Sequence, residues 1–161
     1  MRTPEQLATD FYTAFQRGDA AAMGACYHPD ARFEDPVFGA LSVSDTRDMW
    51  AMLITRSKGD LQIRFFDVVA QGQDVTLTWE AEYYFSATRR KVFNQIRTTL
   101  RCQDGLIISH QDRFNLWKWA SMALGLPGML LGFTPYFRRR LQTQVRSALA
   151  RYQQQAGQQT R

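Results

Sequence analysis

The pattern of hydrophobic and polar residues changes near residue 60. Before that point, apolar side chains recur every three or four residues, as in Leu7, Phe11 and Phe15 after the Thr3-Pro4 pair, which predicts amphipathic helices. After it come four runs of strand length, at residues 61–70, 75–85, 91–102 and 106–117. The turn-forming stretches QGQD, SATRR and QDG separate these runs, which predicts an antiparallel meander. Helices followed by strands indicate an α+β domain, with a curved antiparallel sheet wrapped around N-terminal helices.

The first 60 residues are expected to hold three helices and one short strand. Asp19 can cap a short second helix that follows closely on the first. A turn is expected at His28-Pro29-Asp30, and a short strand at residues 31–35. Ser44 or Asp45 can cap the third helix.

Residues 116–154 form a C-terminal extension with its own pattern. Residues 116–137 are apolar but contain Pro127-Gly128, which predicts a helical hairpin rather than a membrane-spanning helix. A final helix is expected from Thr134-Pro135, with one apolar stripe and arginines elsewhere, and residues 153–161 are expected to fray. We expect residues 1–161 to form one domain, in which the extension packs over the open end of the sheet and deepens a pocket. Dimer packing and peripheral membrane contact are the alternatives for this segment.

Composition and charge narrow the possible functions. Of the 161 residues, 45% are hydrophobic and 13% are aromatic, which is typical of a packed domain. The net charge is +5, and the excess lies in six arginines after residue 137, where no acid occurs. The interleaving of aromatic and basic residues expected of a nucleic-acid surface is absent. Cys26 and Cys102 are too few for a disulfide framework and lack metal-ligand spacing. With no apolar leader at the N-terminus, we expect a cytoplasmic protein that needs no metal or cofactor.

Two acids, Glu34 and Asp35, stand directly before Pro36 at the end of the predicted short strand. If Asp35 faces an apolar pocket, poor solvation favours its protonated form and suits it to act as a general base. An Asp-Pro step is also a common turn element, so Asp35 can instead cap the turn or pair with an arginine.

A second pair of ionisable residues lies on the last predicted strand. Period-two alternation places Leu106, Ile108, His110, Asp112 and Phe114 on one face of that strand. Asp112 is a second candidate base, and His110 can orient it or relay a proton. The alternative is a structural His–Asp pair that bridges the sheet to the final helices.

Alternation on the preceding strand indicates which side chains share the same interior. Asn94 and Thr98 fall on the apolar face, and Arg97 falls on the opposite face unless a bulge reverses the strand. The candidate ligand-binding residues are inward-facing or aromatic positions: Tyr12, Phe15, Trp50, Asn94 and Phe114. Simple core packing is the alternative for the aromatic members.

The stretch FYTAFQRGDAAAMGACYHPDARFEDPVFG, residues 11–39, resembles the N-terminal half of the nuclear transport factor 2-like superfamily. That group includes ketosteroid isomerases, SnoaL-like polyketide cyclases and limonene epoxide hydrolases, and the resemblance is closest to uncharacterised members. It covers residues 4–117 and implies a cone-shaped fold, in which a bent sheet encloses an apolar pocket and helices close it. The small isomerases lack the C-terminal extension that this sequence carries.

The resemblance also implies roles for individual residues. The Glu-Asp-Pro-Val string at residues 34–37 matches the segment that carries the proton-shuttling aspartate of ketosteroid isomerase, which is Asp35 here. The two oxyanion donors of that enzyme fall at Phe11 and at Arg97 or Thr98, which are neither a tyrosine nor an acid. SnoaL-like cyclases place an aspartate base on a late strand, and the resemblance implies that Asp112 can stand in that role. An epoxide-hydrolase-like relay would require Arg97 to point inward between Asp35 and Asp112.

The sequence thus predicts a SnoaL-like protein that binds a small hydrophobic molecule in an internal pocket. Cofactor-independent acid–base chemistry of the isomerase or cyclase type is the expected activity. A non-catalytic ligand-binding or interaction module is the first alternative, and an epoxide-hydrolase-like enzyme is the second. We expect a homodimer through the outer face of the sheet, and no nucleic-acid partner.

Overall fold

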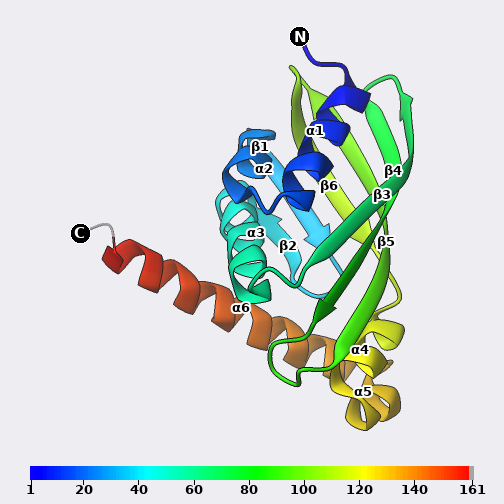
Figure 1. The fold of residues 1–161 in the computed structure, drawn as a ribbon, viewed down its shortest axis with the longest axis vertical. Coiled ribbons are helices and arrows are strands. Elements are labelled where there is room, and N and C mark those ends of the chain that lie inside the picture. Colours follow the sequence, from blue (N-terminus) through cyan, green and yellow to red (C-terminus); the bar gives the residue numbers. More distant parts are fainter. Residues whose placement is uncertain (160–161) are drawn as a thin grey trace.

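The computed structural model describes residues 1–159 and shows a curved six-stranded sheet with helices packed against one face (Figure 1). The helices are α1 (Pro4–Gln16), α2 (Ala20–Ala25), α3 (Val43–Ser57), α4 (Leu116–Leu124), α5 (Leu126–Leu131) and α6 (Pro135–Gln159). The strands are β1 (Tyr27–Asp35), β2 (Gly39–Ser42), β3 (Gln62–Gln71), β4 (Asp74–Tyr84), β5 (Lys91–Gln103) and β6 (Leu106–Arg113), in the spatial order β2-β1-β6-β5-β4-β3. The α+β class, the N-terminal helices and the C-terminal helical extension are confirmed.

The helix starts follow local capping chemistry. Thr3 forms a capping box with Gln6 at the start of α1, as the Thr-Pro pair predicts. The N-cap of helix α3 is Ser42, two residues before the first predicted cap, because the Ser42 hydroxyl accepts the hydrogen bond from the Asp45 backbone N–H. The predicted fraying from residue 153 is wrong as far as residue 159. The Gln153 side chain donates to Asp45 and Asp48 of α3, at 2.9 Å in each case, and α6 continues to Gln159.

The sheet is antiparallel except at one junction. The four long strands pair as the predicted meander, but β1 lies parallel to β6. Strand β1 also includes His28-Pro29-Asp30, predicted as a turn, and its register on β6 shifts between Tyr27 and Arg32. Strand β2, which pairs with the end of β1, was not predicted from the sequence. Such long-range pairing has no local signal, because each strand needs its partner to form.

A bulge in β6 changes which side chains face the interior. Arg101 pairs with Ser109 and Cys102 with Ile107, so Ile108 is the extra residue. Ile107 is therefore buried, while Leu106 and Ile108 are only half-buried, and their predicted inward placement is wrong. Beyond the bulge the predicted alternation holds, and both His110 and Asp112 are buried.

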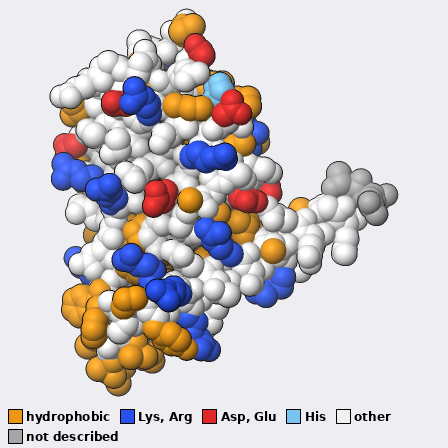
Figure 2. Space-filling model, turned by 180° about the vertical axis from the view of Figure 1, so that it is seen from behind, with side chains coloured by type: hydrophobic (Ala, Val, Ile, Leu, Met, Phe, Trp, Pro, Cys, Tyr) orange, Lys and Arg blue, Asp and Glu red, His pale blue; other side chains and the backbone are white. Residues whose placement is uncertain are grey.

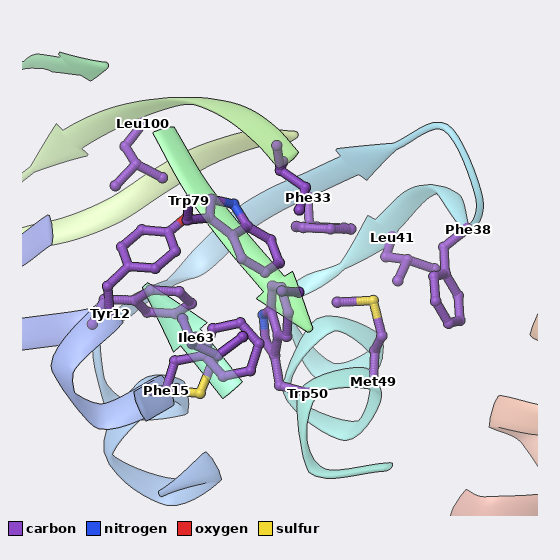
Figure 3. Close-up of a cluster of buried hydrophobic side chains, with 14 of the residues drawn as sticks. Tyr12, Phe15, Phe33, Phe38, Leu41, Met49, Trp50, Ile63, Trp79 and Leu100 are labelled. Carbon is purple, nitrogen blue, oxygen red and sulfur yellow. The ribbon is translucent and has the colours of Figure 1, made fainter. Parts of the chain in front are cut away.

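The core lies between the sheet and the N-terminal helices. Figure 3 shows Tyr12 and Phe15 of α1, Trp50 of α3 and Trp79 of β4 directed toward one another. Phe15 contacts both tryptophans edge-on, with ring centroids 5.0 and 5.3 Å away. Such aromatic pairs stabilise the core beyond the area they bury.

The C-terminal helices close one end of this assembly. Helix α6 crosses beside α3, and Leu141 and Leu149 are buried, while Phe137, Val145 and Tyr152 pack partly against the core. This is the predicted apolar stripe. None of the helices within residues 1–159 is both long enough and apolar enough to traverse a membrane.

Candidate active site

The structure contains a cavity of about 350 Å³ between the sheet, α3 and the C-terminal helices. Its wall is mainly apolar, with Leu53 from α3, Trp119 from α4 and Leu141 from α6 among the contributors. Six of the eight residues predicted from the sequence line it: Phe15, Asp35, Trp50, Asn94, Asp112 and Phe114. An apolar cavity with a few converging polar groups is the usual form of a small-molecule site.

The other two predicted residues lie behind the cavity wall. Tyr12 and His110 are almost fully buried and are not among the lining residues. The prediction that Tyr12 contacts a ligand directly is therefore corrected. Its hydroxyl lies 3.1 Å from Thr98 Oγ1 and forms a buried hydrogen bond behind the cavity wall.

Asp112 is held in place by two hydrogen bonds to one of its oxygens. Thr98 Oγ1 donates to Asp112 Oδ1 at 2.5 Å, and His110 Nε2 lies 3.0 Å from the same atom. Within residues 1–159, both side-chain hydrogen bonds of Asp112 use Oδ1 and neither uses Oδ2. Because Asp112 lines the cavity, Oδ2 is the oxygen that can meet a ligand there.

A chain of hydrogen bonds determines which ring nitrogen of His110 carries the proton. An ionised Asp112 can only accept, so Nε2–H of His110 donates to it, and Nδ1 of the neutral ring is an acceptor. The Tyr27 hydroxyl lies 2.7 Å from Nδ1 and donates to it, while Trp50 Nε1 donates to the Tyr27 oxygen at 3.0 Å. Burial raises the pKa of Tyr27 well above its usual value, which keeps this proton in place. His110 therefore positions Asp112, and only one tautomer satisfies the whole chain.

Asp35 combines the two interpretations left open by the sequence. Its Oδ1 accepts hydrogen bonds from the backbone N–H groups of Val37 and Phe38, at 2.9 and 2.5 Å, so it does cap the turn after β1. It also lines the cavity. Burial raises the pKa of Asp35 from 3.8 to about 7, and the negative charge of Asp112 adds to the rise, while the backbone N–H groups of Phe38, Val37 and Gly39 oppose it. Asp35 can thus carry a proton near neutral pH.

Comparison with known proteins identifies the family of this chain. A family model described as a SnoaL-like domain matches residues 8–110. This chain belongs to the SnoaL-like family. No functionally curated protein matches the SnoaL-like chain significantly.

Solved structures share the fold of this SnoaL-like protein. IdmH from Streptomyces antibioticus, a polyketide-cyclase candidate, is 19% identical with a TM-score of 0.65, over 78% of this chain and all of its own (100%). A protein from Catenulispora acidiphila with a ketosteroid isomerase-like fold, solved with trimethylamine, is 19% identical with a TM-score of 0.62, over 81% and 98%. TerC, co-crystallised with polyporic acid, is 16% identical with a TM-score of 0.64, over 74% and 98%. At these identities the likeness shows the fold alone.

The SnoaL-like protein lacks the oxyanion donors that the isomerase resemblance implies. Phe11 is buried among aromatic rings, and Thr98 is bonded to Asp112 and to Trp79. Arg97 is exposed, as alternation predicted, so it does not stand between Asp35 and Asp112. The geometry of an Asp–Arg–Asp relay through Arg97 is therefore not formed.

One cavity residue outside the predicted set of site residues is placed to act as a donor. Tyr83 lines the cavity, and its oxygen accepts a hydrogen bond from Trp119 Nε1 at 2.8 Å, which leaves its own proton free. Burial raises the pKa of Tyr83, with a smaller contribution from the charge of Asp35, so the phenol stays protonated. No local signal identifies Tyr83, because its partner comes from the C-terminal extension, 36 residues away.

Thr98 is the junction of the buried network, and its removal is expected to be costly. Its hydroxyl contacts Tyr12, Trp79 and Asp112. Thr98→Val keeps the side-chain shape but leaves the Trp79 N–H and the Tyr12 O–H without an acceptor. We expect a loss of about 2 kcal/mol in the free energy of unfolding, measured by urea titration.

The matched control is Thr99→Val, one position along the same strand on the exposed face. It is expected to change stability by less than about 0.5 kcal/mol. Equal effects of the two substitutions would show that the buried network does not contribute to stability.

Within residues 1–159, no three His, Cys, Asp or Glu side chains are grouped so as to hold a metal ion.

Proposed function

We propose that this SnoaL-like protein is a cofactor-independent acid–base enzyme acting on a small hydrophobic carbonyl compound, by isomerisation or cyclisation. The observation that carries the proposal is the pair of carboxyl groups on one apolar cavity, Asp35 and Asp112, held in different environments. Pairs of ionisable groups whose environments differ in this way are typical of sites that need an acid and a base at the same pH.

The geometry supports a division of roles between the two carboxyl groups. Asp112 is fixed through Oδ1 by Thr98 and His110, which leaves Oδ2 to take a proton from the carbon next to a substrate carbonyl. Asp35, with a pKa of about 7, supplies a proton or a hydrogen bond to the carbonyl oxygen, where the negative charge develops.

Tyr83 is proposed as the second donor to that oxygen. It takes the place of the tyrosine that the isomerase resemblance would put at Phe11. A donor directed at developing charge contributes about 3 kcal/mol to lowering the barrier. In isomerisation, Asp112 then delivers the proton it took to another carbon of the enol, and the enol O–H proton returns to Asp35. In cyclisation, the enol carbon bonds to a second carbonyl carbon as its C=O π bond opens, that oxygen takes the proton held by Asp112, and the enol O–H proton returns to Asp35.

The substrate class follows from the cavity wall. Aromatic and aliphatic side chains such as Phe15, Leu53 and Ile96 favour an apolar ring system, and Asn94 offers one further polar contact. Among proteins of the same fold, IdmH is a polyketide-cyclase candidate and TerC was co-crystallised with polyporic acid. These neighbours support an aromatic or polyketide-like carbonyl compound.

The proposal is tested by solvent exchange at carbon. The full-length protein is incubated in D2O with two probes, an aryl 1,3-diketone and a β,γ-unsaturated cyclic ketone, and deuterium uptake is followed by NMR. We expect uptake next to the carbonyl to exceed the buffer rate for at least one probe. The double variant Asp35→Asn/Asp112→Asn should return uptake to the buffer rate.

A second candidate function, non-catalytic ligand binding, is favoured by one observation: Phe11 and Thr98 replace the two oxyanion donors of the isomerases. Quenching of tryptophan fluorescence distinguishes the candidates, because Trp50, Trp79 and Trp119 all line the cavity. Probes that quench this fluorescence but show no exchange above the buffer rate would favour binding without catalysis.

A further inference from the structure

The α4–α5 hairpin and the start of α6 carry a cluster of exposed large apolar side chains that belong to neither the core nor the cavity wall. Figure 2 shows hydrophobic side chains gathered at this end of the molecule, with basic side chains beside them. We call this cluster the hairpin patch: Trp117, Leu126, Met129, Leu130, Leu131, Phe133 and Tyr136, each between 44% and 72% exposed. Scattered apolar residues are ordinary on a protein surface, but a contiguous group of this kind marks an interaction site.

The packing inside the hairpin explains why these side chains point outward. Its two helices meet through small residues: a Cβ added at Gly128 would lie 2.0 Å from the backbone oxygen of Ala120, and one at Gly132 would lie 2.9 Å from the Ala120 Cβ. There is no space between the helices for a leucine or a phenylalanine. The Trp117 indole also donates to the Met129 backbone oxygen at 3.0 Å, which fastens the two helices together. The patch is thus a fixed surface and not a poorly packed core.

Positive charge surrounds the patch and no acid follows it. Residues 113–161 contain no Asp or Glu. Lys118 on α4 and Arg138, Arg139 and Arg140 on α6 are exposed and close in sequence to patch residues. Arg90 joins this rim from the β4–β5 loop, where its side chain donates to the Met122 backbone oxygen at 2.9 Å. Apolar and aromatic side chains bordered by lysine and arginine are typical of segments that lie in the interface of an anionic bilayer.

We propose that the hairpin patch docks this protein on anionic lipid surfaces, with its apolar side chains in the interface and the basic rim on the headgroups. A second copy of the chain is a poorer occupant, since a symmetric contact places the same patch against itself. The basic rims of the two copies would then approach each other with no acidic partner in residues 113–161.

The hairpin is also firmly attached to the cavity. Trp119, two positions from Trp117 on α4, lines the cavity and donates to Tyr83. Thr88 and Arg90 of the β4–β5 loop donate to backbone oxygens of α4. Docking through the patch would therefore hold the whole molecule, and not a loose tail, at the lipid surface.

Co-flotation with vesicles tests the proposal directly. The full-length protein is mixed with phosphatidylcholine vesicles that contain or lack 30% phosphatidylglycerol (about a third anionic lipid, within the range in which basic segments bind). We expect flotation with the anionic vesicles and little with the neutral ones. Arg138→Gln/Arg139→Gln/Arg140→Gln should weaken binding about a hundredfold, and Leu130→Ser/Phe133→Ser at least tenfold.

Matched controls remove the same groups elsewhere on the surface. Arg17→Gln/Arg32→Gln/Arg97→Gln loses the same charge, and Phe66→Ser/Val69→Ser removes exposed apolar side chains from β3. Both controls should float like the unsubstituted protein. Thermal unfolding of all variants should be unchanged, because every substituted side chain is exposed.

The fluorescence of Trp117 measures whether the hairpin patch enters the bilayer. It is 44% exposed, whereas the other three tryptophans are buried. Brominated lipids should quench part of the fluorescence, and Trp117→Phe should remove that quenchable part.

The proposal is overturned if the full-length protein fails to float with anionic vesicles, or if the patch and control variants bind equally. It is also overturned if the patch substitutions abolish only self-association in analytical ultracentrifugation. These outcomes do not depend on the carbon-exchange result, so the two proposals can fail separately.

Discussion

Replacing Asp112 with asparagine is expected to slow proton abstraction from a carbon acid by about a thousandfold, while the protein stays folded. Asparagine has nearly the same shape, and its Oδ1 can accept both hydrogen bonds that Asp112 Oδ1 receives, from Thr98 and His110. Its NH2 group replaces Oδ2, the oxygen that meets the cavity, and an amide cannot take a proton at neutral pH. The substitution therefore removes the base and little else. The measurement is the initial rate of deuterium uptake into the probe that the unsubstituted protein turns over.

The control for this prediction is Asp104→Asn. Asp104 lies in the exposed turn between β5 and β6, with a φ of 53° that asparagine tolerates. It removes one carboxylate far from the cavity wall and should leave the rate unchanged. If Asp112→Asn behaves like Asp104→Asn, Asp112 is not the base, and the structural His–Asp pair is the better description of β6.

Replacing Asp35 with asparagine is expected to stabilise the protein at high pH. The pKa of Asp35 is about 7 in the folded chain, against 3.8 for an ordinary aspartate, so the folded state keeps a proton that the unfolded state releases between these values. Stability contributed by this group is therefore full below about pH 3.8 and falls as the pH rises through 7. The full shift corresponds to as much as about 4 kcal/mol above pH 7. Asparagine does not titrate, keeps an oxygen for the Val37 and Phe38 N–H groups, and avoids this penalty.

Urea titrations at pH 5 and pH 9 measure the effect. The gain of Asp35→Asn over the unsubstituted protein should be largest at pH 9 and should shrink toward pH 5. Glu34→Gln, the exposed neighbour on the same strand, is the control and should show little change at either pH. A gain that is the same at both pH values would mean that Asp35 does not titrate near 7. A stabilising substitution at a proposed catalytic group is the pattern expected when a site is built at some expense to stability.

The local part of the fold was predictable from the sequence. The Thr3-Pro4 start, the four long strands and the apolar stripe of α6 follow from capping and periodicity, which depend on neighbouring residues. The predictions failed where a distant segment decides the conformation. His28-Pro29-Asp30 is part of β1 because β6 lies alongside, and the bulge at Ile108 turns Ile107 inward. A bulge is set by the partner strand, so alternation in one strand cannot reveal it.

The candidate site also contains residues that the sequence predicted and residues that only the structure identified. Asp112, Asn94 and Thr98 were assigned to the interior from alternation alone, and Asp35 from its motif. Tyr83 and Tyr27 were not assigned hydrogen-bonding roles in the site, because those roles rest on Trp119 and His110, which lie far away in the sequence. Tyr12 was assigned to the ligand, but its hydroxyl is used by Thr98 behind the wall. Periodicity gives the face on which a side chain lies, but not the atom it contacts.

The amino-acid sequence by itself determined the α+β class, the likeness to SnoaL-like proteins and the inward face of Asp112, because these depend on patterns among near neighbours. The EDPV segment identified the scaffold and supplied Asp35. Only the tertiary structure decided that Asp35 both caps its turn and lines a cavity with Asp112, and that it titrates near pH 7. The physical reason is desolvation: the pKa of a carboxyl group depends on what surrounds it in space, and most of what surrounds Asp35 comes from distant parts of the chain.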